Sequence, residues 1–78
     1  GGDPGSRSPP PELATLTDRE QQVLLLLARG MTNSEIAAEL VLGEATIKTY
    51  VSNILSKLHL RDRIQAVVYA YEHRLIDR

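Results

Sequence analysis

The side chains of this chain that are best suited to chemistry share one face of a helix predicted over residues 44–58. Six residues recur there at intervals of three and four, and five of them are polar, with only one charge. A face kept only for solubility more often carries Glu and Lys. Short hydrogen-bonding side chains beside one cation suit contact with base edges in a major groove. The six are Ala45, Lys48, Thr49, Ser52, Asn53 and Ser56.

The opposite side of the same predicted helix is an apolar stripe, which must be buried against other elements. Its partner is a short helix over residues 33–40, which carries Ile36, Ala37 and Leu40. Residues 41–43 form the turn between the two helices, so residues 32–58 are predicted to form a helix–turn–helix. The stripe consists of Ile47, Tyr50, Val51, Ile54, Leu55 and Leu58.

The whole pattern predicts an all-α fold, a compact four-helix bundle, with helices at about 17–29, 33–40, 44–58 and 63–75. The run of apolar residues over 23–27 makes the first helix central to the core. Gly30 follows the first helix as a C-terminal cap. Pairs of a capping residue and a Glu or Gln three positions later mark three helix starts. These pairs are Thr17 with Glu20, Thr32 with Glu35, and Asp62 with Gln65.

Composition limits what kind of protein this is. With 78 residues the chain has room for one domain, and without cysteine it has no disulfide or thiolate metal site. His59 and His73 lack partners at ligand spacing, the serines lack a His–acid constellation, and no Gly-rich phosphate loop is present. We therefore expect no enzyme activity, no metal and no cofactor. Without an apolar run of about 20 residues or a signal-peptide pattern, we expect a soluble, cytoplasmic protein with no membrane partner.

The charge is unevenly distributed. The net charge of −1 argues against a nucleic-acid role. Residues 44–63, however, hold four basic residues against two acidic ones, so the positive charge lies in the same segment as the polar face. This excess is small and predicts weak DNA affinity for a single copy. Residues 1–11 are nearly all Gly, Pro and Ser and are expected to be a disordered linker or a cloning remnant, with the domain itself at 12–78.

Several spaced motifs carry a family resemblance. They are Leu16–Glu20 with Leu24, Gly30–Ala37, Thr46–Lys48, Val51–Leu58, Arg63 and Gln65–Ala66. This pattern resembles the LuxR-type helix–turn–helix DNA-binding domain found at the C-terminus of NarL/FixJ-family response regulators. The resemblance implies sequence-specific binding of double-stranded DNA as the output domain of a two-component transcriptional regulator, with helix 44–58 in the major groove. Gly43 departs from the family, in which a serine cap is common at that position.

Face, charge and resemblance together give the candidate site residues. Those expected to face the bases are Lys48, Thr49, Ser52 and Asn53. The residues expected to contact the DNA backbone are Thr32, Asn33, Thr46, Lys57, Arg61 and Arg63.

The resemblance also implies partners. It assigns dimerisation to the helix at 63–75, which carries more apolar residues than one small core needs. There, Ile64, Val67 and Tyr71 are expected to face the core, and Val68 and Leu75 to form the interface of a homodimer. The other expected partners are an N-terminal receiver or other regulatory domain and RNA polymerase.

Two other functions have to be weighed against DNA binding. A helical protein-interaction module would show exposed Leu, Met or aromatic residues on helix 44–58, but its outer face is Lys, Thr, Ser and Asn. A domain like sigma-factor region four shares the helix–turn–helix, but it would require recruitment to RNA polymerase instead of autonomous operator binding. The sequence specifies neither the operator nor whether the protein activates or represses transcription.

Overall fold

The computed structural model describes residues 11–73 and Leu75, and this part of the chain contains helices and no strands. The predicted all-α class is confirmed, and three of the four predicted helices agree with the structure to within a residue at each end. A 3-10 helix ahead of them was not predicted. The elements are η1 (Pro11–Thr15), α1 (Asp18–Ala28), α2 (Asn33–Leu40), α3 (Glu44–Lys57) and α4 (Arg63–Glu72).

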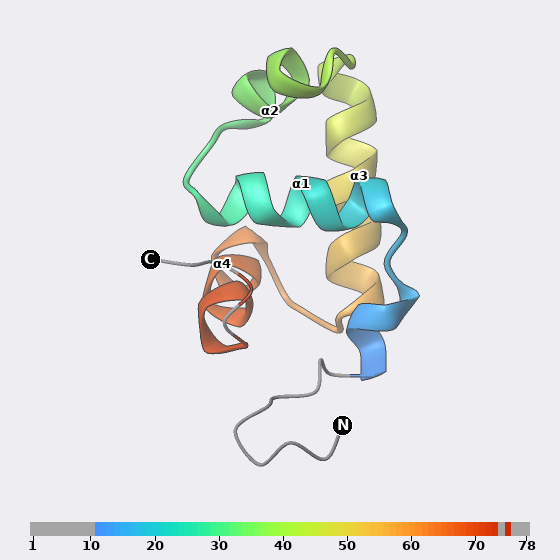
Figure 1. Cartoon of the computed structure of the whole chain (residues 1–78), viewed down its shortest axis with the longest axis vertical. Helices are drawn as coiled ribbons and strands as arrows, with labels where there is room; N and C mark the ends of the chain where they lie inside the picture. Colours follow the sequence, from blue (N-terminus) through green and yellow to red (C-terminus); the bar gives the residue numbers. More distant parts are fainter. Residues whose placement is uncertain (1–10, 74, 76–78) are drawn as a thin grey trace.

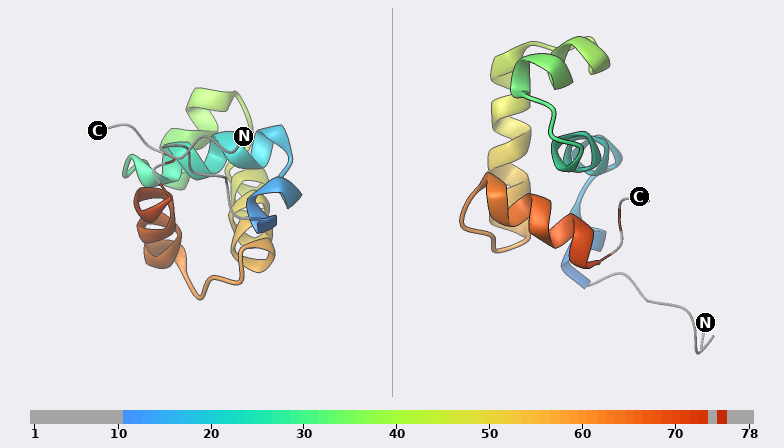
Figure 2. Two further views of the ribbon diagram at one scale, coloured as in Figure 1. Left: turned by 60° about the horizontal axis from the view of Figure 1, so that its bottom comes forward. Right: turned by 90° about the vertical axis from the view of Figure 1, so that its left-hand side faces the viewer.

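Helix α1 is the centre of the arrangement. It crosses the middle of α3, with α2 on one side of it and α4 on the other (Figure 1). The same order is visible when α1 is viewed along its axis (Figure 2, right). Helix α1 packs on α2, α3 and α4, and α2 packs on α1 and α3. The central position predicted from the apolar run at 23–27 is confirmed.

The core forms where these helices meet. Its largest fully buried side chains come from α1, α2 and α3, and η1 adds Leu13 and the adjoining Leu16. Because the buried positions of α3 are Ile47 and Ile54, with Leu58 just beyond its end, the apolar stripe predicted from the sequence is the face that packs inward. The largest fully buried side chains are those of Val23, Leu24, Leu27, Ile36, Ile47 and Ile54.

Side-chain caps fix where the helices begin. The Thr17 hydroxyl accepts from the Glu20 N–H at 3.1 Å, and the Thr17 N–H donates to Glu20 Oε1 at 2.9 Å. Thr32 and Glu35 repeat this reciprocal pair at the start of α2, so both predicted capping boxes are confirmed. Asp62 caps α4 by accepting from the Gln65 N–H at 3.0 Å.

The first three helices end in the same way, with a residue in the left-handed region. Gly30, Val41 and His59 have φ angles of 88°, 57° and 58°. After each of them, the next N–H donates to the carbonyl five residues back: Met31 to Leu26, Leu42 to Ala37 and Leu60 to Leu55. This Schellman pattern reverses the chain direction and satisfies carbonyls at the helix end. Glycine adopts the left-handed region freely, whereas the β-branched Val41 is strained there.

Val41→Asn is expected to raise the free energy of unfolding by about 1 kcal/mol. A left-handed residue with a Cβ costs roughly 1–2 kcal/mol, and Asn tolerates this conformation better than valine. The Val41 side chain is 88% exposed, so little packing is lost with it. Urea denaturation measures the change. Val41→Thr is the matched control, because it is polar but still β-branched; an equal gain in both variants would point to surface polarity instead of backbone strain.

Helix α4 differs from prediction in its length and in its orientation. It was predicted to reach residue 75 but ends at Glu72, because the chain turns back and the Leu75 N–H donates to the Ala70 carbonyl. It buries Ala66, Tyr69 and Ala70, so the expectation that Ile64 and Tyr71 face the core is wrong. Pro11 lies in η1, and the remainder of the predicted arm, residues 1–10, lies outside the described residues.

Candidate nucleic-acid interface

The outer polar face of α3, defined as Ala45, Lys48, Thr49, Ser52, Asn53 and Ser56, is exposed along its whole length. The four residues predicted to face DNA bases all belong to it. The Thr49 hydroxyl donates to the Ala45 carbonyl at 3.1 Å, so its oxygen lone pairs and its methyl group remain available. The surface thus offers a cation, hydroxyls and an amide at side-chain lengths that allow close approach.

Packing on the opposite side of α3 holds this face in place. Buried Ile47 and Ile54 lie against the core, and α3 contacts α1, α2, α4 and η1. Gly43 precedes α3 as its N-cap and makes no side-chain cap bond, whereas Glu44 places a carboxylate in the first turn, where the helix dipole favours negative charge. The polar face therefore stands on a rigid helix with only its inner side occupied.

The predicted backbone-contacting residues at the helix starts are placed differently from one another. Thr32 and Thr46 are exposed, at the N-cap of α2 and in the first turn of α3. Asn33, the first residue of α2, is half-buried and its Oδ1 accepts from Arg63 Nη1 at 2.8 Å. The structure thus brings Asn33 and Arg63 together, although 30 residues separate them in the sequence.

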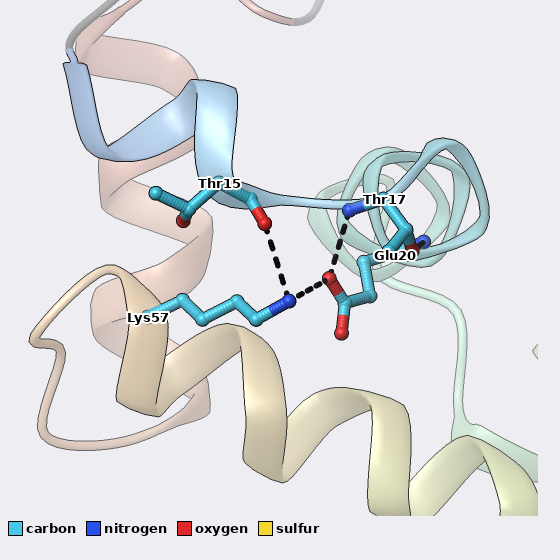
Figure 3. Close-up of polar contacts among 4 residues, drawn as sticks. All are labelled: Thr15, Thr17, Glu20 and Lys57. Atoms are coloured by element: carbon cyan, nitrogen blue, oxygen red, sulfur yellow. Dashed lines mark hydrogen bonds and ion pairs between the residues drawn. The ribbon is translucent and has the colours of Figure 1, made fainter.

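Lys57 is bonded inside the domain. Its Nζ lies 2.8 Å from Glu20 Oε1 and 3.2 Å from the Thr15 carbonyl oxygen, and it joins the end of α3 to α1 and η1 (Figure 3). Its side chain is half-buried. Position 57 follows Ile54 by three residues and therefore borders the apolar stripe. This spacing was the signal in the sequence that the Lys57 side chain lies partly against the core. Its contact with the DNA backbone stays a prediction.

Glu20 is the buried acid of this pair, with 4% of its surface exposed. Burial by itself would raise the pKa of the Glu20 carboxyl. The hydrogen bond from Lys57, the Thr17 N–H and the charge of Lys57 outweigh that effect, and the pKa is lowered below its ordinary value. Glu20 is therefore ionised at neutral pH and holds Lys57 in place.

The last two cations near α3 have opposite surroundings. Arg61 is exposed in the connection between α3 and α4. Arg63, the first residue of α4, is half-buried; besides Asn33, its guanidinium donates to the carbonyl of Met31. The contact of Arg61 with the DNA backbone stays a prediction, whereas Arg63 has partners within the chain.

Helix α4 carries an exposed apolar stripe. Ile64, Val68 and Tyr71 are 70%, 41% and 44% exposed and follow one another at steps of four and three residues, which places them on one side of the helix. Of the two residues predicted for an interface, Val68 lies at the centre of this α4 stripe. Leu75 is half-buried and lines a pocket with Leu13, Leu24 and Leu25. The exposure of Ile64 and Tyr71 was missed because α4 is apolar on several sides.

Comparison with known families decides what this arrangement is. Residues 14–70 match the family model described as bacterial regulatory proteins, luxR family, which covers α1 to α3 and nearly all of α4. The chain belongs to the luxR family. The predicted LuxR-type helix–turn–helix domain is confirmed, and the family is one of regulatory proteins, not of enzymes.

The proteins similar to this chain include response regulators. The chain is 56% identical over 61 residues to the response regulator protein VraR of Staphylococcus aureus and to the proteins of that name from Staphylococcus saprophyticus and Staphylococcus epidermidis. The alignment covers 78% of this chain and 29% of each relative. A crystal structure of the response regulator ChrA from a heme-sensing two-component system matches with a TM-score of 0.70 at 37% identity, over 91% of this chain and 32% of that one.

Two further findings concern the described part of this luxR-family domain. Among residues 11–73 and 75, no group of three or more His, Asp or Glu side chains is arranged to hold a metal ion. No helix in the same residues combines the length and the apolar character needed to cross a membrane.

Proposed function

We propose that this domain binds double-stranded DNA sequence-specifically, as the output domain of a two-component response regulator. The observation that carries the proposal is the outer polar face of α3, exposed over its full length while the other side of the helix is buried. Such a helix, held by a helix–turn–helix, fits the major groove of B-DNA. Family membership and the response-regulator relatives support the same function.

The chemistry of each group suggests its role in the groove. Lys48 is a donor suited to guanine O6 and N7. Thr49 already donates its hydroxyl hydrogen, so it offers an acceptor to adenine or cytosine amino groups, or its methyl group to thymine. Ser52 and Asn53 offer both donors and acceptors. We assign these four residues to base contacts.

Other residues are proposed to contact the DNA backbone. Thr32, Asn33 and Thr46 lie at the N-terminal ends of α2 and α3, where N–H groups and helix dipoles favour phosphate. Arg61 supplies an exposed cation. The Lys57 ammonium has three hydrogens, and Glu20 and the Thr15 carbonyl take two of them, so a phosphate contact would use the third.

The working form in this proposal is a homodimer joined through the α4 stripe. One copy presents few free cations and contacts only about a half-site, so two copies are needed for useful affinity. The α4 stripe is continuous and apolar, and a two-fold axis would place it against its own copy. Half-sites should then be about 10 base pairs apart, on one side of the duplex.

The chain spans 29% of the length of the curated relatives named above, so a larger regulator is part of the proposal. We propose an N-terminal receiver or other regulatory domain that controls pairing, and RNA polymerase as a partner of the DNA-bound dimer. The site of action would be the cytoplasm, where bacterial DNA lies.

Lys48→Ala tests the proposed base contacts. With a site first obtained by selection from random duplexes, the variant should discriminate between that site and random DNA less well than wild type, by roughly 1–3 kcal/mol. Fluorescence anisotropy titrations with the selected duplex and with a random duplex measure the two affinities and their ratio. Arg29→Ala is the control, because it removes the same charge from the exposed end of α1 and should leave discrimination unchanged.

Salt dependence tests the proposal as a whole. Wild-type affinity should fall steeply as salt rises, with a slope of about 0.9 per phosphate contact on logarithmic axes. Failure to bind any duplex at low salt, or binding that ignores salt, would contradict DNA binding.

A further inference from the structure

Arg63 joins the start of α4 to the start of α2. Its Nη1 donates to Asn33 Oδ1 at 2.8 Å, and its Nη2 donates to the Met31 carbonyl. Met31 belongs to the connection between α1 and α2, and Asn33 is the first residue of α2. All three residues are half-buried. One planar guanidinium thus fixes both the connection and the first turn of α2 relative to α4.

The bond to Asn33 also sets the orientation of its amide. An amide has an acceptor end and a donor end, and a guanidinium offers donors only. Arg63 therefore donates to Oδ1 of Asn33, and the Nδ2 group is the end of the amide that Arg63 does not bind. A DNA phosphate accepts hydrogen bonds and donates none, so Nδ2 is the end that such a partner requires.

The same contact fixes the neighbouring groups. Thr32 lies between Met31 and Asn33, both of which are bonded to Arg63. The hydroxyl oxygen of Thr32 accepts from the Glu35 N–H at 3.1 Å, so Thr32 itself is held as the N-cap of α2. Residues 31–33 therefore have a defined position relative to α4.

We propose that Arg63 is a positioning residue for DNA binding: it orients the Asn33 amide toward phosphate and fixes the start of α2 relative to α4, and it does not itself bind phosphate. The inference rests on the proposed function. It also differs from the expectation that Arg63 contacts the DNA backbone directly, and the two roles predict opposite results for a charge-preserving substitution.

Arg63→Lys separates the two roles. Lysine keeps the positive charge but replaces the rigid two-armed donor with a single ammonium on a flexible stem. The 78-residue variant should bind duplex DNA about tenfold more weakly than wild type, with an unchanged slope of log affinity against log salt. Arg63→Ala should give a similar loss and the same slope. Arg61→Ala, which removes an exposed cation nearby, should flatten the slope by about 0.9.

Asn33→Ala completes the experiment. The part of the Arg63 effect that acts through Asn33 is absent once Asn33 is replaced, so the double variant Asn33→Ala with Arg63→Ala should lose less affinity than the sum of the two single losses. Two losses that add in full would show that Arg63 does not act through Asn33. Circular dichroism at the titration temperature gives the folded fraction, and affinities are compared for folded protein. A merely structural Arg63 would lower the melting temperature and leave that corrected affinity at the wild-type value.

Three further outcomes would overturn the inference. In the first, Arg63→Lys binds like wild type, while Arg63→Ala binds more weakly and its slope of log affinity against log salt is flatter by about 0.9. This is the pattern expected of a direct phosphate contact. In the second, both Arg63 variants bind like wild type once corrected for folding. In the third, wild type binds no duplex, which removes the proposed function as well; binding by wild type with either of the first two results removes this inference alone.

Discussion

Val68→Asp is expected to abolish cooperative binding to paired half-sites while the domain stays folded. Val68 lies at the centre of the α4 stripe and is 41% exposed, so the single chain can accommodate a carboxylate there. In a two-fold dimer each substitution would meet its own copy, which would bring two like charges into an apolar contact. Coupling between two binding events typically raises affinity 5- to 150-fold. We expect the variant to lose all of the coupling between the two half-sites.

Electrophoretic mobility shift with one and with two half-sites about 10 base pairs apart measures this effect. Affinity for the single half-site is the internal reference and should stay near wild type. Val41→Asp is the matched control, because it makes the same chemical change at another exposed valine, outside the stripe. Retained cooperativity in a folded Val68→Asp variant would rule out pairing through α4.

Lys57→Met is expected to lower the free energy of unfolding by roughly 2 kcal/mol at neutral pH, the scale of a hydrogen bond to a charged group. Methionine retains an unbranched apolar stem for packing but removes the ammonium, and the carboxylate of Glu20 is left buried without its cation. Lys48→Met is the control on the exposed face of the same helix and should change stability little.

The pH dependence identifies the cause. In wild type the pKa of Glu20 is lowered in the folded state, so its contribution to stability is present above the ordinary value of 4.5 and is lost as the pH falls through the lowered value. Without Lys57 that contribution shrinks. The difference in the free energy of unfolding between wild type and Lys57→Met should therefore be largest near neutral pH, and it should become smaller below a pH of about 4.5. If this difference in the free energy of unfolding stayed constant down to strongly acidic pH, the variant would have lost packing and not the ion pair.

The parts of the fold that follow from local rules were predictable. Thr17 and Thr32 cap through residues three positions away, and the apolar stripe of α3 needs only the helical period to be recognised. The exposure of Lys48 and its neighbours followed, because the side of a helix opposite a buried stripe faces outward.

Features that depend on contacts distant in the sequence were not predictable. Every residue from Ala66 to Tyr71 is apolar or aromatic, so periodicity alone did not choose the inner side of α4. Buried Ala66 and Ala70 are small and four residues apart, and α4 contacts α1 along its buried side. The partners of Lys57 and Arg63 lie 37 and 30 residues away, a separation at which no local pattern applies.

The attachment of η1 sets where the chain that precedes it meets the domain. Leu13 is buried and the Thr15 carbonyl accepts from Lys57, so the chain enters the domain at a fixed point near the C-terminal end of α3. Helix α2 lies at the opposite, N-terminal end of α3 (Figure 1). Any segment joined ahead of η1 therefore approaches the domain from the end of α3 that is farther from α2.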